Sequence, residues 1–137
     1  MSKLETAICL AARIHEGQLD KNGDPYILHP LRVMLAQDDE LSRIVGVLHD
    51  VVEKSDLTLG DLVVQGFQDE VIGAVDCMTR RRNEDYFDFV KRAASNALAL
   101  PVKLADLRDN LRASSADGDA ERRDRYEKAL ALLGCRS

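Results

Sequence analysis

Apolar residues recur along the chain at the three- and four-residue spacing of one helix face, which predicts a series of amphipathic helices. In the first of them, Ala7, Leu10, Ala11 and Ile14 mark the apolar face of the segment from Leu4 to Glu16. The same pattern recurs toward the C-terminus. The predicted helices cover residues 4–16, 30–37, 40–52, 58–66, 69–78, 85–94, 98–113 and 120–133.

The segments between these helices contain residues that favour turns. Gly17 to Ile27 holds two glycines and a proline and is expected to be a loop. Proline favours the start of a helix and disfavours helical conformation in the residue before it, so His29 is expected to be extended, just ahead of a helix that begins at Pro30. Ser115 to Asp119 is expected to be a turn. No segment has the alternation of a strand, so the fold class is all-α.

The composition agrees with a helical globular domain. With 137 residues the chain is expected to form one domain, residues 1–137, with an ordinary hydrophobic core. Aromatic residues make up only 4% of it, which favours helix over sheet. The net charge of −5 argues against an extended nucleic-acid surface but permits a small anionic substrate, because a bound dication would supply local positive charge.

Three cysteines without metal-site spacing indicate a reducing compartment. Cys9 and Cys77 fall inside apolar helical patterns and are expected to be small buried thiols. No apolar stretch approaches the length of a membrane span, and the first residues lack a signal-peptide pattern. A cytoplasmic location without a membrane partner is therefore expected. The sequence gives no indication of an oligomeric state.

Four side chains in three helical contexts could bind a metal ion: His29, the adjacent pair His49 and Asp50, and Asp106. Two imidazoles and two carboxylates form a mixed nitrogen and oxygen ligand set, which suits Mn²⁺, Fe²⁺ or Zn²⁺. Gly46 leaves space one turn before the His-Asp pair.

Each of these side chains also has an ordinary structural alternative. His29 could cap a helix or fill the core. Asp50 could pair with Lys54 four residues on, and Asp106 could pair with Lys103 three residues back. His15 is expected to support the following loop by hydrogen bonding rather than to bind the ion. The charged run from Asp119 to Lys128 is expected to be a solvated helix face.

Several short segments, in a fixed order, resemble the HD superfamily of metal-dependent phosphohydrolases, and more narrowly the hydrolase domain of RelA/SpoT-type alarmone enzymes and their small stand-alone relatives. The matching segments are His15-Glu16-Gly17-Gln18, Pro25-Tyr26-Ile27-Leu28-His29-Pro30, His49-Asp50-Val51-Val52-Glu53, Gly66-Phe67 followed by Val71 and Thr79, and Lys103-Leu104-Ala105-Asp106 with Asn110. Together they run from about residue 4 to residue 113. The resemblance implies a compact helical HD-domain bundle.

The resemblance also implies a metal centre and a reaction. His29, His49, Asp50 and Asp106 would bind one divalent ion, commonly Mn²⁺ in this branch, which activates a water molecule and polarises the phosphate under attack. The reaction implied is hydrolysis of the 3′-pyrophosphate of guanosine tetra- or pentaphosphate.

Further residues of the family's site have counterparts in this chain. Glu53 occupies the acidic position that orients or deprotonates the water. Asn110, Lys21 and Lys103 occupy positions that contact the nucleotide or its phosphates. These assignments come from the resemblance.

Three positions depart from the family's usual residues, and two of them bear on the chemistry. Lys54 follows Glu53 where the family usually has an aspartate, which replaces a candidate proton acceptor with an ammonium. Asp20 stands where an arginine commonly packs against the guanine base, and a carboxylate cannot supply that stacking cation. Ala113 also replaces an expected threonine.

The sequence therefore predicts a metal-dependent phosphohydrolase whose partner is a small phosphorylated nucleotide, with a guanosine alarmone or a relative favoured. Two alternatives remain. One is a catalytically silent nucleotide-binding or regulatory module that kept the metal cage, which Lys54 would explain. The other is a phosphatase for another nucleotide, such as a nicotinamide dinucleotide phosphate, for which Asp20 would be less damaging.

Overall fold

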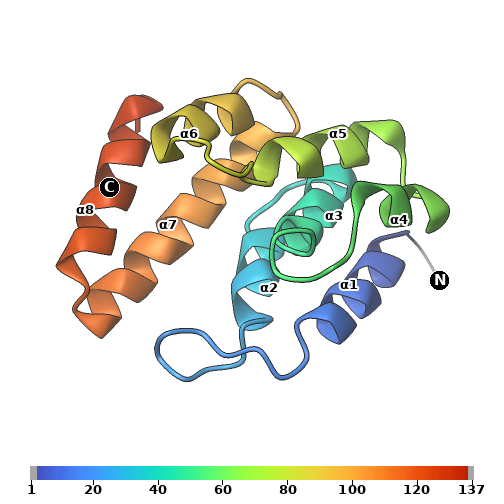
Figure 1. The fold of residues 1–137 in the computed structure, drawn as a ribbon, viewed down its shortest axis with the longest axis horizontal. Helices are drawn as coiled ribbons and strands as arrows, with labels where there is room; N and C mark the ends of the chain where they lie inside the picture. The colour runs from blue at the N-terminus through green and yellow to red at the C-terminus, as the bar shows by residue number, and fades with distance from the viewer. Residues whose placement is uncertain (1–2, 136–137) are drawn as a thin grey trace.

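A computed structural model describes residues 3–135, and within that range the chain forms eight helices and no strand (Figure 1). A single isolated bridge between Leu19 and Pro25 closes the loop after the first helix. The all-α prediction is confirmed. The helices are α1 Lys3–Ile14, α2 Leu28–Leu35, α3 Glu40–Leu48, α4 Leu59–Val64, α5 Asp69–Met78, α6 Tyr86–Ala94, α7 Ala99–Asp117 and α8 Ala120–Leu132.

The long helix α7 lies between two groups of helices. In Figure 1 it runs diagonally through the molecule, with α1 to α5 on one side and α6 and α8 on the other, and it contacts α2, α3, α5, α6 and α8. The larger apolar core is built around α3, where Val45, Val47 and Leu48 are completely buried. A smaller core joins α7 to α6 and α8 through Leu107 and Leu130. A helix buried on nearly all sides, as α3 is, gives a fixed support for the residues that follow it.

A capping box starts α4 near the residue at which the sequence predicted this helix to begin. The Thr58 side chain accepts a hydrogen bond from the Asp61 amide at 3.1 Å, and the Asp61 carboxylate accepts one from the Thr58 amide at 2.9 Å. Gly66, with a φ of +86°, follows the helix in the left-handed conformation that glycine adopts without steric cost. The two ends of this short helix were therefore readable from the sequence.

The helix that carries Asp106 is longer than predicted. Ser115 to Asp119 was expected to be a turn, but α7 continues through Asp117, and only Gly118 adopts the left-handed conformation that ends it. The hydroxyl of Ser115 donates to the Leu111 carbonyl four residues back, so this polar residue is accommodated inside the helix. The prediction of a five-residue turn was wrong for this reason.

Two other local predictions were also wrong. His29 is helical rather than extended, because α2 begins at Leu28 and Pro30 is its third residue, where a missing amide hydrogen costs no helical bond. The helix α3 ends at Leu48 rather than at Val52. The Gly46 carbonyl, which would accept the amide of residue 50 in a continued helix, accepts a hydrogen bond from His49 Nδ1 at 2.6 Å.

The first cysteine is exposed, contrary to the prediction of a buried thiol, and Cys77 is half-buried. The buried residues of α1 are Ala7 and Ala11, and Cys9 lies two residues from each, on the opposite side of the helix. Within residues 3–135, no helix is both long enough and apolar enough to cross a membrane.

Candidate metal centre and its cavity

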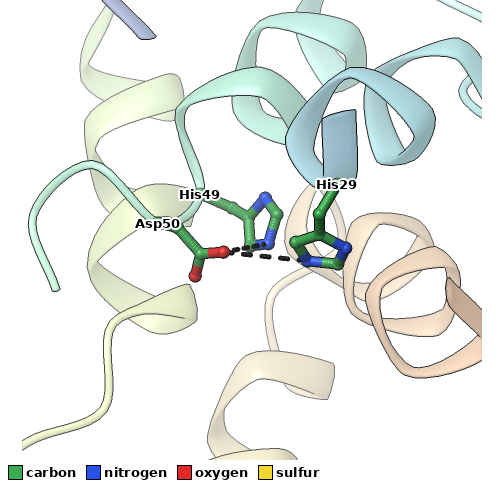
Figure 2. A group of neighbouring side chains, drawn as sticks. All are labelled: His29, His49 and Asp50. Atoms are coloured by element: carbon green, nitrogen blue, oxygen red, sulfur yellow. Dashed lines mark ion pairs between the residues drawn. The ribbon is translucent and has the colours of Figure 1, made fainter. Parts of the chain in front are cut away.

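The four predicted metal ligands meet at one point in the structure. The Nε2 atom of His29 lies 2.9 Å from Asp106 Oδ1 and 3.7 Å from Asp50 Oδ2. The Nε2 atom of His49 lies 3.4 Å from Asp106 Oδ1 and 3.1 Å from Asp50 Oδ2. Figure 2 shows His29, His49 and Asp50 facing one another, with one ligand atom from each within 4.8 Å of the others. All four side chains are between 1% and 13% exposed. They form a compact, largely buried cluster in which two imidazole nitrogens and two carboxylate oxygens could bind a cation.

Three elements bring these side chains together. His29 lies in the first turn of α2, Asp106 lies in the middle of α7, and the His49–Asp50 pair follows the end of α3. Gly46 allows α2 and α3 to approach closely, because a Cβ atom at this position would lie 3.1 Å from the Cα atom of Met34. The space predicted at Gly46 is therefore filled by the backbone of α2.

The orientation of His49 fits a metal ligand. Its Nδ1 atom donates to the Gly46 carbonyl, which leaves the lone pair of Nε2 directed at the cluster. This Nε2 atom is buried and makes no hydrogen bond among the residues described. Buried polar atoms are rarely left without a partner, and a cation at the centre of the cluster would satisfy this one. The residues present thus fit a divalent cation with nitrogen and oxygen ligands.

In the absence of a cation, the two imidazoles and the two carboxylates of the cluster shift one another's pKa values. Burial alone would lower the pKa of each imidazole, but the carboxylates outweigh it, so the pKa of His29 is raised and that of His49 is raised well above its ordinary value. Burial alone would raise the pKa of each carboxyl. The neighbouring imidazoles, and Lys103 in the case of Asp106, hold the pKa of Asp50 and Asp106 below the usual range.

A cavity of about 390 Å³ opens beside the cluster, and its wall carries many cations. The basic residues that line it include Lys54, Arg80, Lys103, Arg122 and Arg125. Glu53 also lines the cavity, and its carboxylate accepts a hydrogen bond from the Arg80 amide at 3.2 Å. The cavity therefore combines a carboxylate-rich floor with a basic wall, an arrangement that suits a polyanion bound through a cation.

Of the three predicted substrate-binding residues, two lie in the wall next to the cluster. Lys103 is buried, with its ammonium 3.2 Å from Asp106 Oδ2 and 4.2 Å from the centre of the Phe89 ring. Asn110 donates to Asp106 Oδ1 at 3.0 Å. The ordinary alternative for Asp106, an ion pair with Lys103, is thus present together with the cluster geometry.

The third predicted substrate-binding residue lies at the rim. Lys21 is largely exposed and lies 3.6 Å from Asp119 at the start of α8. Asp20 lines the same part of the cavity, but its Oδ1 atom accepts hydrogen bonds from the amides of Asn22 and Asp24, so its carboxylate closes the loop. This local role gives a structural reason for the departure at Asp20.

Hydrogen bonds support the loop before α2, as predicted for His15. Its Nδ1 atom pairs with Gln18 Oε1 at 2.8 Å, and Gln18 Nε2 donates to the Lys54 carbonyl at 3.0 Å. His15 is buried, and its ring packs at a tilt against that of Tyr26, with ring centres 5.1 Å apart. This network connects the first loop to the segment that follows the His-Asp pair.

Sequence reasoning assigned no role to two groups that border the cluster or the cavity. Asp109, one turn after Asp106, accepts a hydrogen bond from His29 Nδ1 at 2.7 Å. The charged run on α8 was expected to be fully solvated, but Arg122 and Arg125 line the cavity, and the Arg125 guanidinium lies 4.9 Å from the centre of the Tyr86 ring. The three-residue spacing from Asp106 was the only available signal for Asp109, and a contact between helices is not visible in one-dimensional spacing.

Comparison with known proteins shows that the chain is similar to one part of several longer bacterial proteins. No family model matches it. It is 36% identical over 125 residues to a protein named GTP pyrophosphokinase from Streptomyces coelicolor and 32% identical over 127 residues to one of the same name from Myxococcus xanthus. It is 33% identical over 125 residues to a probable guanosine-3′,5′-bis(diphosphate) 3′-pyrophosphohydrolase from Synechocystis. These matches cover 80–82% of the chain but only 15–17% of the relatives' own length.

A solved structure has the same fold over most of its length. It belongs to a study of a metazoan orthologue of SpoT that hydrolyses ppGpp, and it matches with a TM-score of 0.76 and 28% identity, covering 94% of this chain and 82% of that one. The helical fold and the His-Asp cluster are those of an HD-superfamily domain. Within that superfamily, the sequence and structure matches identify the chain as an HD domain of the RelA/SpoT type.

Proposed function

We propose that this domain is a divalent-cation-dependent phosphohydrolase that removes the 3′-pyrophosphate of guanosine tetraphosphate or a close relative. The observation that carries the proposal is the convergence of His29, His49, Asp50 and Asp106, in which the buried Nε2 atom of His49 makes no hydrogen bond among the described residues. The similarity to alarmone hydrolases supports the choice of nucleotide.

The proposal assigns the four clustered side chains as ligands of one divalent cation, with Mn²⁺ as the ion. A nitrogen and oxygen donor set of this kind accepts Mn²⁺, and the bound cation would supply Lewis-acid chemistry to water and phosphate. The three cysteines are unpaired, which supports the cytoplasmic location expected from the sequence.

Glu53 is proposed to accept the proton of the attacking water. In this reaction the water oxygen forms a bond to the phosphorus attached to the ribose 3′ oxygen, the bond from phosphorus to that 3′ oxygen breaks, and the 3′ oxygen takes up a proton as pyrophosphate leaves. Glu53 is exposed and lines the cavity, and the Arg80 amide holds its carboxylate. Within residues 3–135, no lysine or arginine side chain forms an ion pair with it.

The proposed phosphate and nucleotide contacts follow the wall of the cavity. Lys103 and Asn110, both bound to Asp106, would meet the 3′-phosphates near the cluster, and Lys21 would meet the nucleotide at the rim. Because residue 20 is an aspartate whose carboxylate accepts hydrogen bonds within its own loop, guanine would not be held by a stacking arginine at that position.

In a second candidate function, the domain retains the metal-binding cluster and binds a nucleotide as a regulatory module, without hydrolysing it. Lys54 motivates this regulatory-module alternative, because an ammonium stands next to Glu53 in the segment that should supply acid–base catalysis. Hydrolysis of another nucleotide, such as a nicotinamide dinucleotide phosphate, is a further alternative, and the altered Asp20 position motivates it.

The decisive experiment measures both binding and turnover. Purified protein loaded with Mn²⁺ is incubated with guanosine tetraphosphate, guanosine triphosphate and NADPH, and the release of pyrophosphate and phosphate is followed beside a His49→Ala control. We expect pyrophosphate from guanosine tetraphosphate alone, and none from the control.

Calorimetry on the same samples separates the alternatives. Tight binding of guanosine tetraphosphate without product would support the regulatory module, and phosphate release from NADPH would support the third candidate. Equal behaviour of the wild type and His49→Ala in every assay would remove the metal centre from the proposal.

A further inference from the structure

Asp109 lies behind His29, on the side of the imidazole ring that faces away from the cluster. Its Oδ2 atom is 2.7 Å from His29 Nδ1, although the two residues are 80 positions apart in the sequence. The carboxylate is only 10% exposed. This contact joins the first turn of α2 to α7 at the same ring whose other nitrogen faces Asp106.

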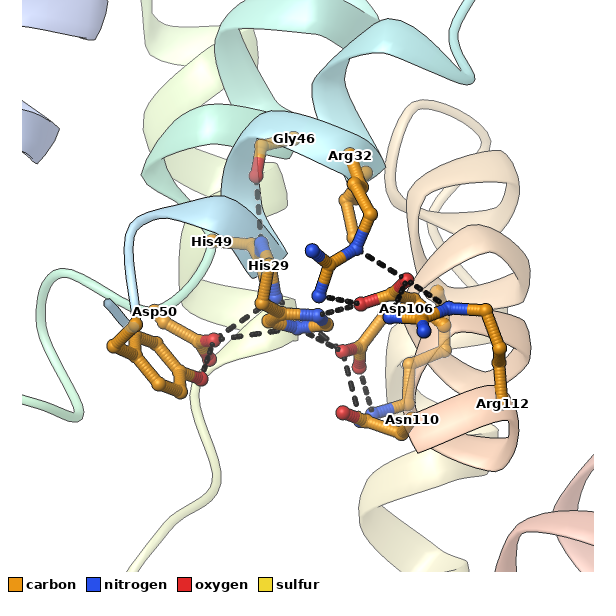
Figure 3. Close-up of polar contacts among 12 residues, drawn as sticks. His29, Arg32, Gly46, His49, Asp50, Asp106, Asn110 and Arg112 are labelled. Carbon is orange, nitrogen blue, oxygen red and sulfur yellow. Dashed lines mark hydrogen bonds and ion pairs between the residues drawn. The ribbon is translucent and has the colours of Figure 1, made fainter. Parts of the chain in front are cut away.

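Two arginines hold this carboxylate in place (Figure 3). Arg32, one turn beyond His29 on α2, donates from Nε to Asp109 Oδ1 at 2.7 Å and from Nη2 to Oδ2 at 3.1 Å. Arg112, on α7, donates to Asp109 Oδ1 from Nη2 at 3.2 Å. The two-pronged Arg32 contact fixes the plane of the carboxylate.

The direction of these hydrogen bonds decides which nitrogen of His29 can bind a cation. An ionised carboxylate only accepts hydrogen bonds, so His29 Nδ1 must carry the hydrogen that it donates to Asp109. The lone pair of a neutral His29 is then on Nε2, which faces Asp50 and Asp106. Carboxylates that accept from the outer nitrogen of a ligand histidine fix its tautomer and make it a better donor.

We propose that Asp109, clamped by Arg32, is a positioning residue that holds His29 in the tautomer and orientation required for binding the cation. This inference rests on the metal centre of the proposed function, and it assigns a role to a residue that does not itself contact the substrate or the ion. The Arg32–Asp109 pair links α2, which carries His29, to α7, which carries the carboxylate that supports it.

The arrangement of donors makes an asparagine at this position especially informative. Three arginine N–H groups, one from Arg32 and two from Arg112, point at Oδ1, whereas one from Arg32 points at Oδ2. The amide oxygen of Asp109→Asn therefore takes the Oδ1 position, which keeps three of these four bonds, and the amide NH2 faces His29. An NH2 group there requires Nδ1 to accept, which moves the imidazole hydrogen to Nε2. The nearly isosteric change should therefore block the ligand nitrogen.

The test measures cation affinity and the tautomer of His29 directly. Titration calorimetry with Mn²⁺ and with Zn²⁺ is performed on the wild type, Asp109→Asn, Asp109→Ala and Arg32→Gln. We expect Asp109→Asn and Asp109→Ala to weaken binding by about 10- to 100-fold, and Arg32→Gln to weaken it less, because Arg112 still holds the carboxylate. Long-range ¹H–¹⁵N spectra of the Zn²⁺-loaded wild type should show His29 protonated at Nδ1.

Glu84→Gln is the matched control. Glu84 is a similarly buried carboxylate held by an arginine, with Arg92 Nε 2.9 Å away, but it contacts no histidine of the cluster. This variant should bind Mn²⁺ as the wild type does. Thermal unfolding of every metal-free variant checks that it is folded before titration.

The outcomes separate this inference from the proposed function. Unchanged affinity in folded Asp109→Asn, with a wild type that binds Mn²⁺, would overturn the positioning role alone. A wild type that binds no cation would overturn the metal centre itself. If Asp109→Ala does not fold, Asp109→Asn and Arg32→Gln decide the question, and wild-type affinity in both would count against it.

Discussion

The hydroxyl of Tyr26 donates a hydrogen bond to Asp50 Oδ2 at 2.5 Å. Lys54, which could have paired with Asp50 one helical turn back, instead places its ammonium over the Tyr26 ring, 5.1 Å from the ring centre. The ordinary ion pair between Asp50 and Lys54 is therefore absent from the described structure. Asp50 is left facing the two imidazoles, and the ammonium is held at the edge of the cavity.

The first prediction concerns Lys54. Replacing it by aspartate should raise the turnover of guanosine tetraphosphate about tenfold or more, because a second carboxylate near Glu53 can share the proton transfer, and general acid–base groups contribute at least this much. Steady-state kinetics with Mn²⁺ measure the change. Lys54→Met removes the ammonium without adding an acid and should leave turnover nearly unchanged. A gain of equal size in both variants would mean that loss of the ammonium, rather than the new acid, raises the rate.

The second prediction concerns Glu53. Glu53→Gln retains an oxygen that can accept from the Arg80 amide, so the fold and the affinity for Mn²⁺ should be unchanged. Loss of the proton acceptor should lower kcat by about 100-fold. Rapid-mix product assays and calorimetry on the same preparation check both statements. Wild-type kcat in this variant would show that Glu53 does not take the proton.

The third prediction concerns pH. The pKa values of His29 and His49 are raised in the metal-free fold, so their stabilising effect is fully present below the unfolded value of about 6.5 and is lost as pH rises through the folded values. The pKa values of Asp50, Asp106 and Asp109 are lowered, so their effect is lost only in acid. Metal-free protein should therefore have its highest melting temperature between about pH 4.5 and 6.5.

Above neutral pH, the bound cation should offset the loss of melting temperature that is expected for the metal-free protein. It competes with protons for the two imidazoles, so its apparent affinity should rise from pH 6 to pH 8 and its binding should release protons. Melting curves with a chelator or with Mn²⁺, and calorimetry in buffers of different ionisation enthalpy, measure these effects. A metal-free melting temperature that climbs steadily to pH 8 would contradict the charge assignment.

The fourth prediction concerns the contact between α2 and α3. Gly46→Ala places a Cβ atom 3.1 Å from Met34 Cα and 3.2 Å from Met34 N, so the two helices must separate slightly. We expect a loss of about 1–3 kcal/mol in the free energy of unfolding, and weaker Mn²⁺ binding because each helix positions a histidine. Gly73→Ala in α5, where a Cβ meets no atom within 4 Å, is the control and should stabilise the protein by about 0.5–1 kcal/mol. Chemical denaturation compares the two variants, and equal effects would rule out the steric explanation.

The fifth prediction concerns the buried pair of Asp106 and Lys103. Asp106→Ala removes the counterion of a lysine that is only 3% exposed, so it should cost about 3–5 kcal/mol of stability in addition to abolishing cation binding. The double variant Asp106→Ala with Lys103→Met should recover most of the stability but none of the cation binding. Denaturation and Mn²⁺ titration of the single and double variants test this. A stable single variant would show that Lys103 finds another partner.

The helical periodicity of the sequence predicted where the helices lie, but not all of their ends. Apolar residues at three- and four-residue spacing require a buried face, and this requirement identifies helices such as α1 and α3 without any knowledge of their neighbours. The ends of α3 and α7 depended on individual side-chain contacts, such as the bond from His49 to the Gly46 carbonyl. Burial of Cys9 was predicted wrongly because a helix can be apolar on a face that nothing covers.

The candidate site shows the same division. The sequence by itself determined the all-α class and pointed to the four clustered side chains, because their residue types and order match a family pattern. Only the tertiary structure decided that Tyr26 rather than Lys54 contacts Asp50, that Asp109 supports His29, and that Arg125 reaches the cavity. Periodicity is a property of one helix and is written along the chain. Contacts between helices depend on how these pack around a shared core, and this packing brings together residues up to 80 positions apart.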